Sequence, residues 1–244
     1  MKGTLEELIK YKMIEIIPAI LAKDYEEMKN QISLVKGIVP VAQLDLCDGI
    51  FVPSQTWPFS TGGFEDYNFQ KILNEEEGMP FWEEIDLELD MMVVDAVKNF
   101  DIYCKLGPKR IIFHLEAVGD LEEFRHFIEG IDVYVRDVIE IGVAINTGTP
   151  LESIFPLVNY LDFVQCMGIA KIGYQGQPFD EKVLDNIKIL KEKYPDLIVT
   201  VDGAVSFETA GKLAEVGADR LAAGSVIFKS EDIRSTINDL ENTI

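Results

Sequence analysis

Eight short apolar runs alternate with helical patterns along the chain, and this alternation limits the possible folds more than any other feature. The runs are rich in β-branched residues, as strands are, and cover residues 14–21, 41–47, 85–93, 110–116, 140–146, 163–169, 197–203 and 220–228. Helical patterns lie between them, at 24–37, 66–77, 120–131, 150–161, 180–195 and 206–218. Strands that alternate with helices form a parallel sheet with helical crossovers. Eight such units in 244 residues predict an α/β fold of the (β/α)8 TIM-barrel type, because a doubly wound sheet usually has fewer strands.

The chain shows no internal boundary. No linker rich in Ser, Pro and Gly divides it, so we expect a single barrel domain over residues 1–244. Residues 1–12 have an amphipathic helical pattern without the apolar region of a signal peptide, and we interpret them as an N-terminal helical extension. Residues 50–84 are rich in Pro, Gly and aromatic residues, and we expect an insertion near the barrel mouth there.

Charge and cysteine content narrow the classes of partner. The chain carries 22 Lys and Arg against 43 Asp and Glu, a net charge of −21. Such a surface repels nucleic acid and anionic membranes, so we expect neither as a partner. No apolar run approaches the ~20 residues that a membrane-spanning helix needs. Three cysteines without metal-like spacing fit a reducing, cytoplasmic location. The sequence leaves open whether the chain forms a homo-oligomer.

Acidic residues recur at the carboxyl ends of the predicted strands. In "QLDLCDG", residues 43–49, Gln43 and Asp45 share one face of a strand, and Asp48 begins a turn. Asp90 and Asp202 end two further strands. A single acid at a strand end can simply face solvent or cap a turn. Several acids at one rim of a barrel repel each other unless a cation or a proton balances them, which favours a functional site.

The fourth predicted strand places two more polar residues toward the barrel interior. His114 and Glu116 alternate on this strand. We interpret them as a structural, hydrogen-bonded pair in preference to catalytic residues.

Six stretches in order resemble the ribulose-phosphate 3-epimerase family, over roughly residues 14–230, and mark the chain as a divergent member. They are "IIPAILAKDYEEM", "LDLCDGIFVPSQT", "FHLEA", "GYQGQPFDEKVLDNI", "VDGAVSFETAGKLAEVGAD" and "AAGSVIFKSED". The resemblance implies a barrel of the ribulose-phosphate-binding type. It also implies a sugar-phosphate substrate and an isomerase of carbohydrate metabolism, in the pentose phosphate pathway, that interconverts D-ribulose 5-phosphate and D-xylulose 5-phosphate.

The resemblance assigns the chemistry to two carboxylates. Asp45 and Asp202 match the family's two acids, one of which removes the C3 proton while the other returns a proton to the opposite face of an enediolate. The family holds a divalent cation with these acids and two histidines, whose positions are Gln43 and Asp90 here. The implied metal ligands are therefore Gln43, Asp45, Asp90 and Asp202, an all-oxygen set that favours Mg²⁺ or Mn²⁺ over Zn²⁺ or Fe²⁺. The alternative is that the metal has been lost.

Substrate and phosphate contacts are also implied by the resemblance. Backbone N–H groups of glycine-rich loops can hold a phosphate without lysine. The matching positions are Gly173, Tyr174, Gln175, Gly176, Gly203, Ala204, Gly224 and Ser225, with Met92 and Met167 as pocket-lining residues that could equally be core filling.

Two other functions stay open. The chain could be an epimerase for a ketohexose 6-phosphate, or a non-catalytic or repurposed phosphosugar-binding barrel that has lost the histidine ligands. Ala19, where the family has a serine, and the residues Gln43 and Asp90 support the second alternative. A related decarboxylase or synthase is disfavoured, because "ELDMM" lacks the lysine that those enzymes carry on the third strand.

Overall fold

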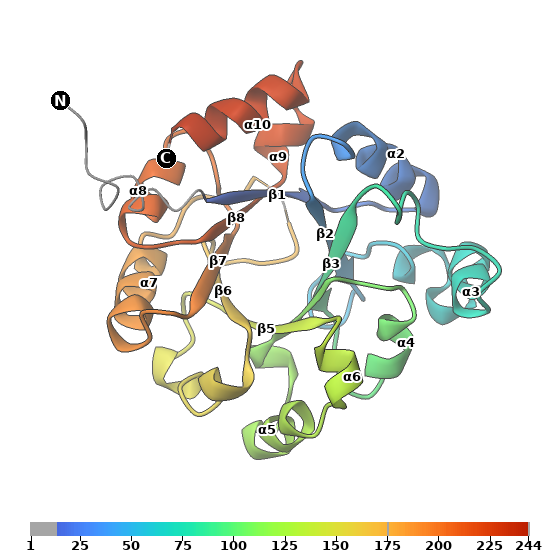
Figure 1. The fold of residues 1–244 in the computed structure, drawn as a ribbon, viewed down its shortest axis with the longest axis horizontal. Helices are drawn as coiled ribbons and strands as arrows, with labels where there is room; N and C mark the ends of the chain where they lie inside the picture. Colours follow the sequence, from blue (N-terminus) through green and yellow to red (C-terminus); the bar gives the residue numbers. More distant parts are fainter. Residues whose placement is uncertain (1–13, 175, 244) are drawn as a thin grey trace.

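Eight parallel strands form a closed barrel in the computed structural model of the chain, which describes residues 14–174 and 176–243 (Figure 1). The strands are β1 (Glu15–Ile20), β2 (Val41–Cys47), β3 (Asp86–Met92), β4 (Arg110–His114), β5 (Glu140–Ile145), β6 (Phe163–Met167), β7 (Ile198–Asp202) and β8 (Arg220–Ala223). Each strand pairs with the next, and β8 pairs with β1. The predicted (β/α)8 fold is confirmed. The predicted helical extension, residues 1–12, lies outside the described residues.

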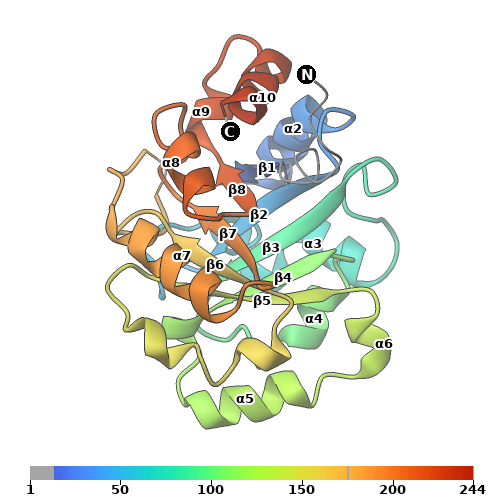
Figure 2. The same cartoon turned by 60° about the vertical axis from the view of Figure 1, so that its left-hand side comes forward.

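Helices and short turns surround the barrel on all sides (Figures 1 and 2). The helices are α2 (Tyr25–Val35), α3 (Tyr67–Leu73), α4 (Phe100–Cys104), α5 (Leu121–Glu129), α6 (Val133–Arg136), α7 (Lys182–Lys193), α8 (Ala210–Glu215), α9 (Ser225–Phe228) and α10 (Ile233–Asn242). Single 3₁₀ turns are η1 (Phe59–Thr61), η2 (Gly63–Glu65), η3 (Leu115–Ala117), η4 (Leu151–Ser153) and η5 (Val158–Tyr160). Among the described helices, none is long and apolar enough to cross a membrane.

Two predicted elements differ from the structure. The segment 150–161, predicted as a helix, forms only η4 and η5, because Pro156 has no N–H to donate and its ring blocks a continuous helix. The run 220–228, predicted as one strand, ends at Ala223, and the chain turns at Gly224 into α9. Helices α4, α6 and α10 were not among the predicted patterns.

Aspartates begin many of the helices. Asp24, Asp66, Asp120, Asp132 and Asp232 each precede a helix and accept a hydrogen bond from a backbone N–H of its first turn. A side-chain oxygen at this position satisfies a donor that the helix cannot pair internally. Part of the acidic excess of the chain therefore stabilises helix ends.

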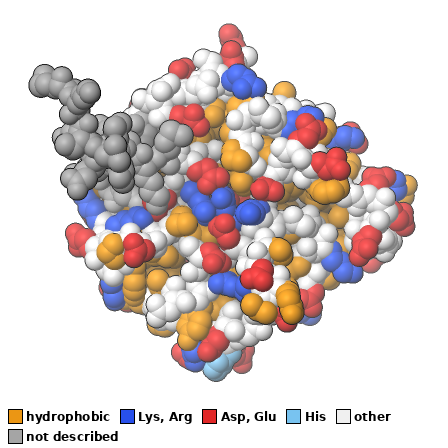
Figure 3. Space-filling model, in the orientation of Figure 1, with side chains coloured by type: hydrophobic (Ala, Val, Ile, Leu, Met, Phe, Trp, Pro, Cys, Tyr) orange, Lys and Arg blue, Asp and Glu red, His pale blue; other side chains and the backbone are white. Residues whose placement is uncertain are grey.

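Buried arginines close the amino-terminal end of the barrel. Arg110 contacts Glu88 at 2.9 Å and Glu140 at 3.2 Å, and Arg220 contacts Glu140 at 3.2 Å. Both arginines also pair with Glu15. These residues begin β4, β5, β8 and β1 or lie near the start of β3, so the network lies at the end opposite the acids of the strand ends. Figure 3 shows acidic and basic side chains meeting near the centre of one face of the molecule.

Candidate active site

Three aspartates from separate strands converge inside the carboxyl end of the barrel. Asp45 on β2 and Asp90 on β3 are register partners, and Asp202 is the last residue of β7. One oxygen from each carboxylate lies within 4.8 Å of the others. Asp90 is fully buried and Asp45 is 8% exposed. The convergence that the sequence predicted from strand ends is therefore present in the structure.

The side-chain amide of Gln43 forms hydrogen bonds to two of these acids. Its Nε2 donates to Asp45 Oδ1 at 2.8 Å and to Asp202 Oδ2 at 3.2 Å. Gln43 Oε1 and Asp90 Oδ2 are buried, and neither has a hydrogen-bond partner among the described residues. A buried oxygen without a hydrogen-bond partner destabilises the fold. These two oxygens can therefore still accept a hydrogen bond or bind a cation beside the three carboxylates.

His114 contacts Asp90 and not Glu116. The ring Nε2 lies 2.9 Å from Asp90 Oδ1, and both side chains are fully buried. Glu116 lies in η3, where it accepts a hydrogen bond from the backbone N–H of Asn146 at 2.9 Å. The predicted His114–Glu116 pair is therefore wrong, because the strand ends at His114 and the turn carries Glu116 away from the interior.

Burial and mutual repulsion change the protonation of the two acids that Gln43 bridges. Burial, followed by the charges of Asp202 and Asp90, raises the pKa of Asp45 well above its ordinary value. Burial and the charge of Asp90 raise the pKa of Asp202 to about 7. Burial alone would lower the pKa of His114, but the adjacent Asp90 outweighs it and raises that pKa. A carboxyl group whose pKa lies near neutrality, as that of Asp202 does, can both accept and donate protons at physiological pH.

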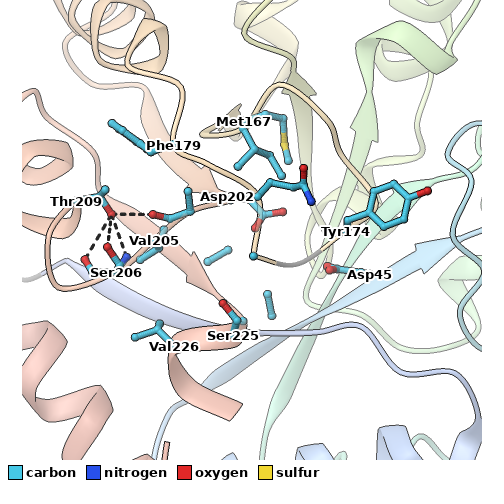
Figure 4. Close-up of a pocket in the computed structure, with 18 of the residues that line it drawn as sticks. Asp45, Met167, Tyr174, Phe179, Asp202, Val205, Ser206, Thr209, Ser225 and Val226 are labelled. Atoms are coloured by element: carbon cyan, nitrogen blue, oxygen red, sulfur yellow. Dashed lines mark hydrogen bonds between the residues drawn. The ribbon is translucent and has the colours of Figure 1, made fainter. Parts of the chain in front are cut away.

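A cavity of about 320 Å³ opens above these acids (Figure 4). Asp45 and Asp202 point toward the same space in Figure 4, and both line the cavity. Its size is at the lower end of the range for small-molecule sites. Gln43 and Asp90 lie beneath it and are fully buried.

Most residues predicted for substrate and phosphate binding line this cavity. They are Met92, Met167, Gly173, Tyr174, Gly176, Gly203, Ala204, Gly224 and Ser225. The other predicted residue, Gln175, lies outside the described residues. None of the described lining residues is Lys or Arg. An anion there would therefore depend on backbone N–H groups and hydroxyls.

The loop after β7 has an unusual backbone conformation. Gly203 has φ +99° and Ala204 has φ +55°, a left-handed value that a residue with a side chain adopts only rarely. The Thr209 hydroxyl donates to the carbonyl of Ala204 at 2.8 Å and accepts from the N–H of Ser206 at 2.9 Å (Figure 4). These bonds hold the loop in a conformation that Ala204 alone would disfavour.

Several residues that line the cavity were not predicted from the sequence. Ile169, Phe179, Ser206, Thr209 and Val226 also line the cavity. The spacing of Ser206 and Thr209 just after the aspartate–glycine pair of β7 was the available signal, because hydroxyls at that spacing often bond to a turn. Asp48, predicted to begin a turn, accepts from the N–H groups of Ile50 and Phe51 and so shapes the loop after β2.

Gly168, directly after β6, packs closely against the backbone of Gly203, directly after β7. A substitution at Gly168 therefore tests whether this packing maintains the shape of the cavity. A Cβ at Gly168 would lie 2.2 Å from the carbonyl oxygen of Gly203, a backbone atom that cannot move aside cheaply. We expect Gly168→Ala to cost about 1–3 kcal/mol in the free energy of unfolding, as overpacked sites do, and to weaken phosphosugar binding. Denaturant unfolding and calorimetric titration with D-ribulose 5-phosphate measure both effects.

Gly148→Ala is the matched control, because no atom of the described residues lies within 4 Å of a Cβ there. Equal stability and binding in the two variants would contradict the packing argument.

The chain is similar to proteins of one family over most of its length. The family model described as "Ribulose-phosphate 3 epimerase family" matches residues 15–228. The ribulose-phosphate 3-epimerase of Schizosaccharomyces pombe is 27% identical over 94% of this chain and 93% of its own length. That of Bacillus subtilis is 28% identical over 95% of this chain and 100% of its own length.

Solved structures with lower sequence identity share the fold. A protein named KGPDC from Streptococcus mutans matches with a TM-score of 0.67 and 13% identity, covering 95% of this chain and 97% of its own. A 3-hexulose-6-phosphate synthase matches with a TM-score of 0.63 and 16% identity, covering 94% and 98%. At this identity the likeness concerns the fold alone.

Proposed function

Because the chain belongs to the ribulose-phosphate 3-epimerase family, we propose that it inverts C3 of a ketose phosphate, interconverting D-ribulose 5-phosphate and D-xylulose 5-phosphate. The observation that carries this proposal is the placement of Asp45 and Asp202. They come from strands that are not neighbours in the barrel, line one cavity, and both have raised pKa values. Inversion at carbon by a two-base mechanism uses two such groups, one for each face.

The two carboxyl groups divide the proton transfer between them. One, as carboxylate, takes the C3 proton from its face, and the electron pair moves into the adjacent carbonyl to give a planar enediolate. The other, as carboxylic acid, delivers a proton to C3 from the opposite face. The raised pKa values support one proton shared by the pair, because two buried carboxylates so close together resist full ionisation. The roles exchange when the opposite epimer binds.

The amide of Gln43 orients both groups. Its two N–H bonds to Asp45 and Asp202 hold one oxygen of each carboxylate. The remaining oxygen of each group is then available to the substrate.

A divalent cation fits the same set of residues. Gln43, Asp45, Asp90 and Asp202 would hold it, since the three carboxylates converge and Asp90 Oδ2 lacks a partner among the described residues. The Gln43 amide would then turn so that Oε1 faces the acids, an exchange of N and O that an amide allows. The cation would replace its two N–H bonds in holding Asp45 and Asp202. Oxygen ligands favour Mg²⁺ or Mn²⁺. Such an ion would stabilise negative charge that develops on the substrate oxygens.

The phosphate would lie among the loops after β6, β7 and β8. Gly173, Gly203, Gly224 and Ser225 line that part of the cavity, and barrels of this type commonly bind phosphate at the last two strands. Backbone N–H groups carry no net charge, so a cradle of this kind can serve in a strongly acidic protein. A cytoplasmic location accords with this small-molecule metabolism.

The epimerase proposal is tested by proton exchange at C3. D-Ribulose 5-phosphate incubated with the protein in heavy water, with Mg²⁺ or Mn²⁺ present, should gain deuterium at C3, as measured by NMR. A ketohexose 6-phosphate tested in parallel identifies the alternative substrate class.

A non-catalytic phosphosugar-binding protein is the second candidate. The observation in its favour is the Gln43 amide, which already bonds to both acids where the family has a histidine. Binding of these sugar phosphates without exchange of the C3 proton, whichever divalent ion is supplied, would favour this function and refute the epimerase.

A further inference from the structure

We infer that His114 is a positioning residue that fixes Asp90 as a metal ligand. This inference rests on the cation site of the proposed function and goes beyond it, because His114 itself touches neither the cavity nor the other two acids. Its Nε2 lies 2.9 Å from Asp90 Oδ1, and both side chains are 0% exposed. The cavity-lining residues do not include His114.

The strand register explains how the two side chains meet. Asp90 is aligned with Ile112 on β4, and His114 lies two residues further along the same face of that strand. Its ring therefore reaches Asp90 diagonally, from the side of the barrel mouth. The ring of Phe51, from the loop after β2, lies 5.4 Å from the His114 ring and limits its rotation.

The hydrogen bond from His114 involves only one of the two carboxylate oxygens of Asp90. His114 occupies Oδ1, whereas Oδ2 is buried without a partner among the described residues. An aspartate can rotate about its last bond and exchange its oxygens. A donor fixed at Oδ1 removes that freedom and keeps the second oxygen available to a cation near Asp45 and Asp202. Groups that orient a ligand in this way commonly contribute substantially to metal affinity.

Within the described part of the chain, the ring has no second hydrogen-bond partner that would hold it elsewhere. His114 Nδ1 is buried, and no described residue bonds to it. In this pair the carboxylate is the metal ligand and the imidazole is the orienting group, the reverse of the common arrangement in which a carboxylate orients a metal-binding histidine.

The test measures Mn²⁺ affinity of the full chain, stripped of metal with chelator, by calorimetry and by the electron paramagnetic resonance signal of free Mn²⁺. His114→Met removes the donor and should weaken Mn²⁺ binding about 10- to 100-fold. His114→Gln places an amide N–H near the Nε2 position and should stay within ~3-fold of the unaltered protein. If His114→Met does not fold, His114→Asn replaces it, since its amide is too short to reach Asp90.

A double-mutant cycle separates positioning from general structural damage. If His114 acts through Asp90, His114→Met should change Mn²⁺ affinity by less than ~3-fold in a protein that already carries Asp90→Ala. An equal loss in both backgrounds overturns the inference, as does unchanged affinity in the single variant. Absence of Mn²⁺ binding by the unaltered protein would refute the metal site of the proposed function as well, whereas the C3 exchange experiment decides the epimerase activity separately.

Discussion

Asp45→Asn and Asp202→Asn should each reduce epimerisation by about 10²–10⁴-fold, the usual contribution of a positioned acid or base. Each substitution keeps the size of the side chain and removes a group that can exchange protons. Without it, the returning proton has no donor on one face of the enediolate. A coupled assay of D-xylulose 5-phosphate formation measures the loss.

The two variants should differ in heavy water. The remaining carboxylate still reaches one face of C3, so each variant should exchange the C3 proton of one epimer without converting it into the other. Asp45→Asn and Asp202→Asn should therefore label opposite epimers, which NMR of the recovered sugars distinguishes.

Asp86→Asn is the control for these variants, because Asp86 is exposed at the other end of β3. It should epimerise at the unaltered rate. Conversion above ~1% of the unaltered rate in both Asp45→Asn and Asp202→Asn would rule out the two-acid mechanism, since the expected loss is at least about 10²-fold.

The sequence predicts the scaffold of the site because the scaffold follows from local patterns. Alternation of strand and helix fixes the barrel, and parallel strands bring their carboxyl ends to one rim. The placement of Asp45, Asp90 and Asp202 at one end of the barrel follows from those two rules, whereas their separation of 4.8 Å or less comes from the structure.

Contacts between side chains depend on register and on where each strand ends, which periodicity does not fix. Alternation alone pairs His114 with Glu116, two residues further along the chain. The structure pairs it with Asp90 on the neighbouring strand β3, because β4 ends at His114. The bridging amide of Gln43 depends likewise on how β2 and β7 approach across the barrel.

Short turns were missed for a related reason. One or two hydrogen bonds define a 3₁₀ turn, so residues 150–161 keep an apolar pattern like that of a helix although Pro156 prevents one. The cavity residues Ser206 and Thr209 belong to a loop whose conformation comes from side-chain bonds to the backbone. Patterns of hydrophobicity carry no information about such bonds.

The metal preference of this chain should follow from the four proposed oxygen ligands, Gln43, Asp45, Asp90 and Asp202. In the unaltered protein, Mg²⁺ or Mn²⁺ should raise the thermal unfolding temperature more than Zn²⁺ does, because hard oxygen ligands prefer hard cations. An ion at 100 times its dissociation constant should stabilise the fold by about 2.7 kcal/mol. Differential scanning fluorimetry of the chelator-stripped protein measures this order.

Gln43→His combined with Asp90→His should reverse that order. The double variant replaces an amide and a carboxylate by two imidazoles, which suit Zn²⁺ and Fe²⁺ better than Mg²⁺. It should also lower the negative charge of the site by one, since Asp45 and Asp202 remain as the only two carboxylates of the set. We expect Zn²⁺ affinity relative to Mn²⁺ to rise by at least ~10-fold, or about 1.4 kcal/mol.

Glu116→Gln, at a mouth residue outside the set, should leave the preference unchanged. If the unaltered protein turns over its sugar phosphate with no response to any divalent ion or to chelator, then the four oxygen-bearing residues do not form a metal site, and the Gln43 amide alone holds the two acids in place.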